Sequence, residues 1–171
     1  PANKVLKTIN ELREVSAGGI VCYTAGFRET GLQGVLMERE LLKDLGEMVM
    51  VGPNCYGVIN YLEKYALWPF EHGGYCPGYG AAIITQSGML SSDITMSQRS
   101  LPMTHMISLG NQASLKNTDF INHLVASRPV RAFGLHIESI EDLQEFEMAA
   151  LQALKAKKPI VVLKTGTSQI G

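Results

Sequence analysis

The chain has 171 residues and a formal net charge of −1, and 46% of its residues are apolar against 18% charged. This composition suits one large or two small domains with a buried α/β core, and it excludes a disordered chain. The sequence has no basic block, which excludes a nucleic-acid surface. No apolar run reaches the ~20 residues of a membrane span, and charges throughout residues 1–15 exclude a signal peptide.

Residues 1–57 alternate between helices and strands in the order αβαβ. Helical spacing of apolar residues predicts helices over 2–16 and 32–46, and short apolar runs predict strands over 20–24 and 48–51. Such alternation is typical of a doubly wound parallel sheet. The segment opens on a helix and the chain has no Gly-x-Gly-x-x-Gly turn, so we expect the second half of a Rossmann-like domain whose first βα unit precedes Pro1.

Residues 58–79 are rich in aromatic residues, glycine and proline without a regular period. This texture predicts a linker that packs against a neighbouring domain. The aromatic side chains could instead line a ligand pocket, but packing is favoured because buried rings usually serve a core or an interface.

From Gly80 onward the pattern is a regular βαβαβαβ alternation, which predicts a parallel sheet with helices on both faces over residues 80–171. The predicted strands cover 81–85, 104–109, 131–137 and 160–163, and the first two helices cover 87–99 and 118–127. The run from Ser139 to Asp142 resembles a capping box. The helix that it opens is expected to place four apolar side chains on one face: Leu143, Phe146, Ala150 and Leu154.

Polar residues gather where the predicted strands of this sheet end, at Gln86-Ser87-Gly88, Gly110-Asn111, Glu138 and Lys164-Thr165-Gly166. Ligands of parallel sheets bind at this edge. Ser87 is a good N-cap, so the turn before the next helix directs free backbone N–H groups and the positive end of the helix dipole toward an anion. The residue types suit a phosphate group better than a metal ion, and no metal site is predicted. The alternative is an ordinary βα turn.

Other chemistry-bearing residues give weaker signals. The four histidines (His72, His105, His123, His136) lack ligand spacing, so each is interpreted as packed or at the surface. Cys55 could be a reactive thiol, but nothing cationic nearby in sequence would lower its pKa, so a structural role is favoured. Lys164 is either a phosphate contact or a solvated lysine. The three cysteines are an odd number without a Cys-x-x-Cys pair, which argues against disulfides and zinc and favours the reducing cytoplasm.

Five motifs carry a resemblance over nearly the whole chain: residues 52–60 (GPNCYGVIN), 84–88 (ITQSG), 108–111 (SLGN), 136–138 (HIE) and 158–166 (KPIVVLKTG). In this order and spacing they resemble the NDP-forming acyl-CoA synthetases, which are similar to the α subunit of succinyl-CoA synthetase. The resemblance implies that residues 1–57 are the latter half of a CoA-binding Rossmann-like domain. It also implies that a flavodoxin-like domain starts at about Gly80, after the linker.

The resemblance also implies roles for individual residues. Two loops would help to hold CoA, one formed by Thr24, Ala25, Gly26 and Phe27 and the other by Pro53, Asn54 and Cys55. The turn of Gln86, Ser87 and Gly88, with Gly110 and Asn111, would face the phosphoryl group of a phosphohistidine, and Glu138 would orient that histidine as the catalytic carboxylate. Ser114 stands where the family often has an aspartate, which puts any role of that acid in doubt.

The implied activity is that of an acid–thiol ligase, which forms an acyl-CoA from a carboxylic acid, CoA and ATP and releases ADP and phosphate. The glycine-rich CoA loop is then expected before Pro1, the phosphorylated histidine after Gly171, and the site for ATP and Mg²⁺ in an ATP-grasp domain or subunit of the same oligomeric enzyme. The run Trp68-Pro69-Phe70 suggests an aromatic acid such as ferulate. Two alternatives remain, a non-catalytic CoA-binding or regulatory module and a nicotinamide-dependent Rossmann oxidoreductase.

Overall fold

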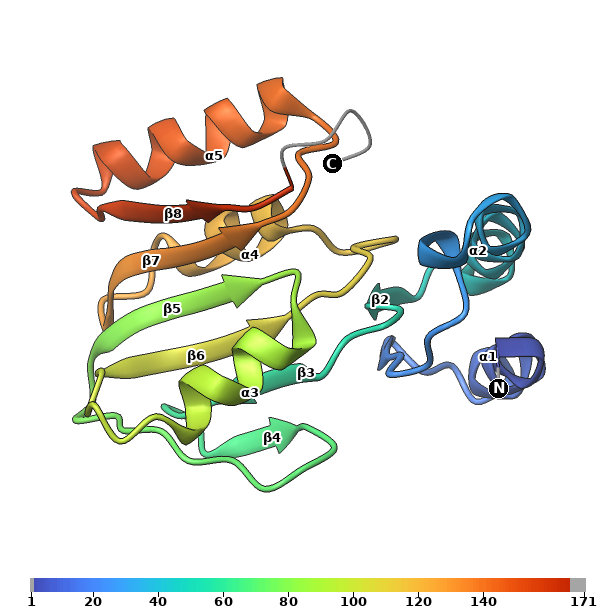
Figure 1. Cartoon of the computed structure of the whole chain (residues 1–171), viewed down its shortest axis with the longest axis horizontal. Helices are drawn as coiled ribbons and strands as arrows, with labels where there is room; N and C mark the ends of the chain where they lie inside the picture. The colour runs from blue at the N-terminus through green and yellow to red at the C-terminus, as the bar shows by residue number, and fades with distance from the viewer. Residues whose placement is uncertain (1, 167–171) are drawn as a thin grey trace.

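A computed structural model describes residues 2–166, which form a larger unit built on one sheet and a smaller unit beside it (Figure 1). The larger sheet has six strands in the order β4-β3-β6-β5-β7-β8. Its four central and C-terminal strands are parallel, as predicted: β5 (Gly80–Thr85), β6 (Met103–Ser108), β7 (Val130–Ile137) and β8 (Ile160–Lys164). Parallel strands covered on both faces are largely apolar, which is why β5, β6 and β7 were predictable from sequence, whereas β8 is apolar although four of its five residues are exposed.

Residues 58–79 contain two strands that the linker prediction missed. Strand β3 (Gly57–Asn60) pairs antiparallel with β6, and β4 (Tyr65–Leu67) pairs antiparallel with β3 and closes that side of the sheet. The turn between them is stabilised by Asn60, whose side-chain oxygen accepts from the N–H groups of Leu62 and Glu63 at 3.0 Å. Strand β4 is exposed along its length, and its three residues are too few for a periodic pattern to predict a strand.

Only some of the aromatic residues of this segment pack as expected. Those that are more than half exposed are Tyr65, Phe70, Tyr75 and Tyr79. The ring of Tyr56 meets those of Trp68 and Phe70 edge to face, with centroids 5.8 and 4.9 Å apart. Trp68 and Tyr61 also pack against the apolar core on the hairpin side of the sheet. Edge-to-face pairs of this kind add to the burial of the rings themselves.

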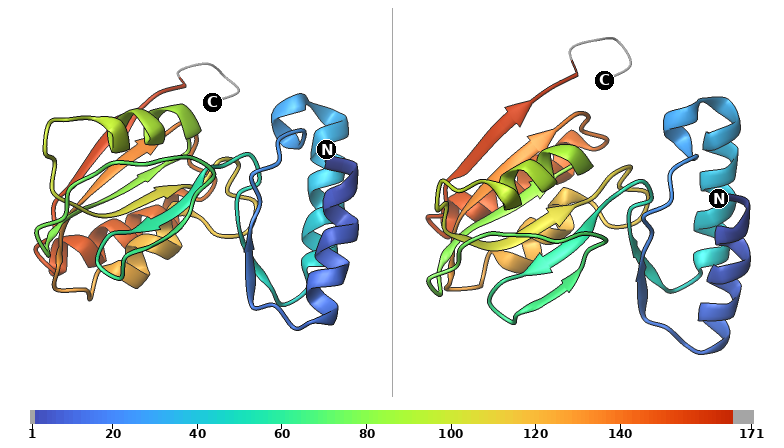
Figure 2. Two further views of the ribbon diagram at one scale, coloured as in Figure 1. Left: turned by 90° about the horizontal axis from the view of Figure 1, so that it is seen from below. Right: turned by 60° about the horizontal axis from the view of Figure 1, so that its bottom comes forward.

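Helices cover both faces of the larger sheet, as predicted (Figure 2). Helix α3 (Gly88–Met96) lies on one face, where Ile94 packs beside Ile83 and Met106. Helices α4 (Asn117–Leu124) and α5 (Leu143–Lys155) lie on the other, over the larger core that contains Ile84 and Phe133. Successive side chains of a strand point to opposite faces, so Ile83 and Ile84 serve different cores.

Helix α5 corrects two details of the sequence interpretation. Its N-cap is Asp142, whose side chain accepts from the N–H of Glu145 at 2.9 Å, and not Ser139. Its fully buried residues are Ala149 and Ala153, whereas the predicted core residues at both ends of the helix, Leu143 and Leu154, are exposed. Alanines bring the helix axis close to the sheet, so the buried stripe follows the smallest side chains of the helix.

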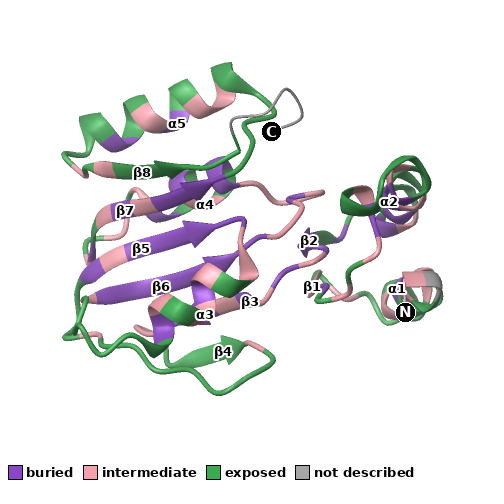
Figure 3. Cartoon of the chain, in the orientation of Figure 1, coloured by how far each residue is buried: buried purple, intermediate pink, exposed green. Residues whose placement is uncertain are grey.

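The smaller unit consists of α1 (Ala2–Glu14), β1 (Gly19–Val21), a short 3₁₀ helix η1 (Arg28–Thr30), α2 (Leu32–Leu45) and β2 (Val49–Val51). Its two strands are parallel, as expected from the αβαβ order. Ile9, Phe27, Leu41 and Met50 are fully buried in a core of their own. Figure 3 shows that much of the surface of α2 is exposed. No helix within residues 2–166 is long and apolar enough to cross a membrane.

The two units are joined by backbone contacts as well as by the chain itself. The loop after β6 returns along the connection between β2 and β3. There the N–H groups of Asn111, Ala113 and Leu115 donate to the carbonyls of Pro53, Gly52 and Met50 at 2.9, 3.0 and 3.0 Å. Ser114 adds to this contact, since its hydroxyl accepts from the N–H of Met50 at 3.2 Å.

Candidate functional site

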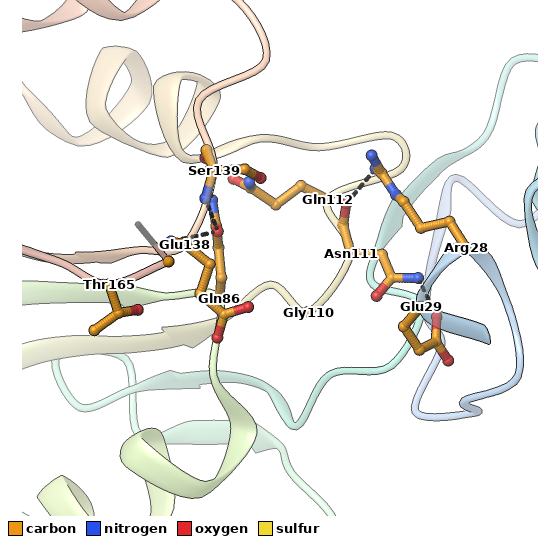
Figure 4. A pocket seen from close by; sticks show the side chains of 10 residues that line it. Arg28, Glu29, Gln86, Gly110, Asn111, Gln112, Glu138, Ser139 and Thr165 are labelled. Carbon is orange, nitrogen blue, oxygen red and sulfur yellow. Dashed lines mark hydrogen bonds between the residues drawn. The ribbon is translucent and has the colours of Figure 1, made fainter. Parts of the chain in front are cut away.

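A cleft opens at the carboxyl edge of the larger sheet, on the side that faces the smaller unit (Figure 4). It is lined by residues from the ends of β5, β6, β7 and β8 and from η1. These are Arg28, Glu29, Gln86, Gly110, Asn111, Gln112, Glu138, Ser139, Thr165 and Gly166. Sequence reasoning placed the strand-end residues at this edge but missed Arg28, Glu29 and Gln112. Arg28 and Glu29 directly follow the expected CoA loop, and this adjacency could have indicated that they lie near the site.

Gln86 holds the backbone beside Glu138. Its side-chain oxygen accepts from the N–H groups of Glu138 and Ser139 at 2.8 and 3.0 Å, and its amide nitrogen donates to the carbonyl of Ser139 at 2.9 Å. A side chain engaged in this way positions a loop and has little left with which to bind a phosphate group. This differs from the phosphate contact expected of Gln86.

The carboxylate of Glu138 borders the cleft without a side-chain partner in the described part of the chain. Glu138 is exposed, and no hydrogen bond or ion pair to its side-chain oxygens is present among the described residues. Lys164, the last residue of β8, does not pair with this carboxylate. Its ammonium group donates to the main-chain carbonyls of Glu138, Thr165 and Gly166. Lys164 therefore supports the rim of the cleft, a role that neither sequence interpretation of it included.

Ser87 is the N-cap of α3, as predicted. Its hydroxyl accepts from the N–H of Leu90 at 3.3 Å, and its own N–H donates to the hydroxyl of Thr85 at 2.9 Å. The first N–H groups of α3 thus have no intrahelical acceptor. Ser87 and Gly88 are not among the residues that line the cleft, and the ring of Tyr56 lies beside Gly88. The structure therefore places this turn next to the cleft and not in its wall.

His136 lies beneath the floor of the cleft. Its Nδ1 is 3.1 Å from the hydroxyl of Thr85 and its Nε2 is 3.0 Å from that of Thr165, so both ring nitrogens are engaged. His105 is also buried; burial first, and the charge of His123 second, lower its pKa to about 4. None of the four histidines lines the cleft, which agrees with their interpretation as packed or surface residues.

Asn111 uses all of its hydrogen-bonding groups to join the two units. Its side-chain nitrogen donates to the carboxylates of Glu29 and Glu38 at 2.6 and 2.9 Å, and its side-chain oxygen accepts from Asn54 at 3.4 Å. Its carbonyl accepts from Arg28. The structure gives Asn111 a structural role in place of the expected phosphate contact, because the two amide hydrogens already serve two carboxylates.

Gly110 is required by the close approach of the two units. Its φ is +55°, and a Cβ there would lie 2.1 and 2.3 Å from the carbonyl oxygens of Asn54 and Pro53. No side chain fits in that space. Gly110 lines the cleft as expected, and its second role in the contact between the units was not predictable from the sequence.

The two loops expected to hold CoA lie side by side, since the N–H of Asn54 donates to the carbonyl of Thr24 at 3.0 Å. Their side chains contribute unequally. Phe27, Pro53 and Cys55 are buried, so the ring of Phe27 belongs to the core and is not available to a ligand. Thr24, Ala25, Gly26 and Asn54 keep accessible surface. Thr24 also lines a second cavity, formed by α1 and β1.

Cys55 has the structural role favoured by the sequence. Its Sγ donates to the carbonyls of Cys22 and Val51 at 3.4 and 3.6 Å. Burial, assisted by the neighbouring Cys22, raises the pKa of the Cys55 thiol to about 12. All three cysteines are free thiols, and no cluster of three metal-binding side chains occurs within residues 2–166.

Comparison with known proteins gives a family model for the second half of the chain and relatives that span both halves. The model of the succinyl-CoA ligase like flavodoxin domain matches residues 78–171. A trans-feruloyl-CoA synthase from an unknown prokaryotic organism is 33% identical over 98% of the chain, and an ADP-forming acetate–CoA ligase of Archaeoglobus fulgidus is 33% identical over the whole chain. The crystal structure of PH0766 from Pyrococcus horikoshii superimposes on 99% of the chain with a TM-score of 0.89 and 30% identity.

The matched proteins are longer than this chain. It spans 25% of the length of each of those two ligases and 39% of the chain in the crystal structure. A structure of an acetyl-CoA synthetase of Ca. Korarchaeum cryptofilum in complex with phosphate and ADP has the same fold, with a TM-score of 0.86 at 24% identity. The expected α/β class is shared with the superimposed structure, and residues 78–171 match the flavodoxin domain of the family.

Proposed function

Since the chain belongs to the family of the succinyl-CoA ligase like flavodoxin domain, we propose that it is one part of an enzyme that joins a carboxylic acid to CoA, uses ATP and releases ADP and phosphate. The ATP-binding part would be a further domain or subunit, and the complete enzyme would be an oligomer. The substrate would be a small or aromatic carboxylic acid, because the relatives' names include both acetate and feruloyl-CoA enzymes.

The free carboxylate of Glu138 carries this proposal. A carboxylate at the rim of a cleft repels a phosphate anion, but it accepts an N–H from an imidazole ring and stabilises the ring when it is protonated. The side chains of Gln86 and Lys164 hold Glu138 by its backbone N–H and carbonyl groups. The carboxylate is therefore left available for such a partner. We propose that Glu138 holds a histidine of the same enzyme in one tautomer while that histidine carries a phosphoryl group.

The N-terminus of α3 would face the phosphoryl oxygens of that group. Its first N–H groups lack intrahelical acceptors, and the helix dipole favours a negative charge there. The phosphoryl group would then pass to the carboxylic acid, and the CoA thiol would displace phosphate from the acyl phosphate. The contribution of this chain to these steps would be positioning and charge stabilisation. CoA would lie along the accessible backbone of the loops at Thr24–Gly26 and Asn54.

The test is Glu138→Gln in the full-length enzyme, which keeps the shape of the side chain and removes its charge. We expect at least about a tenfold loss of acid-labile label on the protein after brief incubation with labelled ATP, equivalent to about 1.4 kcal/mol. Glu147→Gln, at an exposed position of α5, is the matched control and should label like the unaltered protein. Normal labelling of the Glu138 variant would reduce Glu138 to a structural residue. CoA binding without acyl-CoA formation from any acid would favour a regulatory module.

A further inference from the structure

We propose that Arg28 is a positioning residue that couples the loop at residues 24–27 to the segment carrying Glu138. This inference rests on the proposed function, because it assigns CoA to one side of the coupling and the phosphoryl group to the other. Figure 4 shows Arg28 and Glu29 reaching toward Asn111 from the smaller unit, across the cleft from Glu138.

The guanidinium of Arg28 binds three segments that are distant in sequence. Its Nε lies 2.8 Å from the buried carboxylate of Glu38 on α2. Its two terminal nitrogens bind the carbonyl of Asn111, in the loop after β6, and the carboxylate of Glu141, in the loop after β7. One side chain therefore fixes the smaller unit to both loops of the larger unit that border the cleft.

Glu29 connects Asn111 to the expected CoA loop at residues 24–27. Its carboxylate accepts from the N–H groups of Gly26 and Phe27 at 2.6 and 3.1 Å and from the side chain of Asn111 at 2.6 Å. Burial alone would raise the pKa of Glu29, but these donors outweigh it and hold the pKa below its ordinary value. Any displacement of the loop at residues 24–27 must therefore move Asn111 or break a charge-assisted hydrogen bond.

At the other end of the proposed coupling lies the segment 138–141. Gln86 holds the backbone of this segment at Glu138 and Ser139, and Arg28 holds it at Glu141. The segment is thus anchored once to its own sheet and once to the smaller unit. A change in the smaller unit that shifts Arg28 reaches Glu138 through three residues of backbone.

Arginine is the side chain that this junction requires. A planar guanidinium presents several N–H groups in a fixed fork; here the two terminal nitrogens donate to Glu141 and Asn111, while Nε lies within ion-pair distance of Glu38 without making a hydrogen bond to any described residue. A lysine ammonium at the same position has a shorter reach and no fork, so it satisfies Glu38 while releasing Glu141. Arg28→Lys therefore tests the bridge with the charge beside Glu38 retained.

The experiment uses Arg28→Lys, Glu141→Gln and the double variant in the full-length enzyme, with Glu147→Gln as the matched control. Glu141 is at the surface, so its substitution removes one end of the bridge and leaves the buried carboxylate of Glu38 paired. With a carboxylic acid and CoA both present to accept the phosphoryl group and then the acyl group, we expect both single variants to slow the loss of the phosphoryl label by about tenfold, a typical coupling between sites, and the double variant to be no slower. Glu147→Gln should leave both the labelling by ATP and the loss of the label within about twofold of the unaltered protein.

Hydrogen exchange of the same proteins separates the coupling from the chemistry. Added CoA should protect residues 110–115 and 138–141 in the unaltered protein and only the former in Glu141→Gln. Additive slowing in the double variant, or equal protection in all proteins, would overturn the coupling. Absence of any label on the unaltered protein would instead overturn the proposed function, and faster exchange of residues 138–141 in Glu141→Gln, without ligand, would then still support the bridge.

Discussion

Gly110→Ala tests whether the two units are held together by the contact that the structure shows. The added Cβ would lie 2.1 Å from the carbonyl oxygen of Asn54 and 2.3 Å from that of Pro53, and both atoms belong to the backbone. The left-handed φ of +55° costs an alanine about 1 kcal/mol. Displacing a packed loop adds about 1–3 kcal/mol. We therefore expect the variant to lose about 2–4 kcal/mol of the free energy of unfolding.

The assay is urea unfolding of the 171-residue chain followed by circular dichroism, with Gly18→Ala as the control. A Cβ at Gly18 meets no atom within 4 Å, so its substitution should change the free energy of unfolding by less than about 0.5 kcal/mol or stabilise the chain slightly. If Gly110→Ala unfolds at the same urea concentration as Gly18→Ala, the close contact between the loop after β6 and residues 53–54 is absent in solution.

Three further predictions follow from single side chains. His105 stays neutral in the fold, with a pKa of about 4 against about 6.5 when unfolded, so the unfolded chain binds the extra proton and stability falls by about 2 kcal/mol from pH 7 to pH 5. A urea series across this range checks it, and a flat profile would show that the ring is accessible. Asp142→Ala should cost about 0.5–2 kcal/mol in thermal unfolding as the loss of the α5 cap, whereas Ser139→Ala should cost less than about 0.5 kcal/mol. Cys55 should resist alkylation by iodoacetamide at pH 8 while the less buried Cys76 reacts, as mass spectrometry of the peptides would reveal.

Some of the arrangement at the cleft was readable from local pattern. The apolar runs before Gln86 and Glu138 predicted parallel strands, and parallel strands bring their carboxyl ends to one edge. The N-cap role of Ser87 was predictable because N-cap preferences depend only on the residue itself and the next few residues. Where neighbours in sequence decide the conformation, the prediction agrees with the structure.

The hairpin of β3 and β4 shows where local pattern fails. Strand β4 is exposed, and both strands exist because β6 offers an edge with which β3 can pair. The aromatic and glycine-rich composition of residues 58–79 is the same whether the segment is a linker or a hairpin. Only the presence of that partner edge decides between the two.

The sequence by itself determined the α/β class, the parallel strands and the family, because these depend on apolar periodicity and on short motifs in order. Tertiary structure alone decided which polar groups at the cleft are free. Gln86 and Asn111 look like phosphate ligands in sequence, yet backbone groups and carboxylates occupy their amides, and Glu138 is left available. Arg28 reaches Glu141 across 113 positions of sequence, and only the packing of the two units brings their opposite charges together.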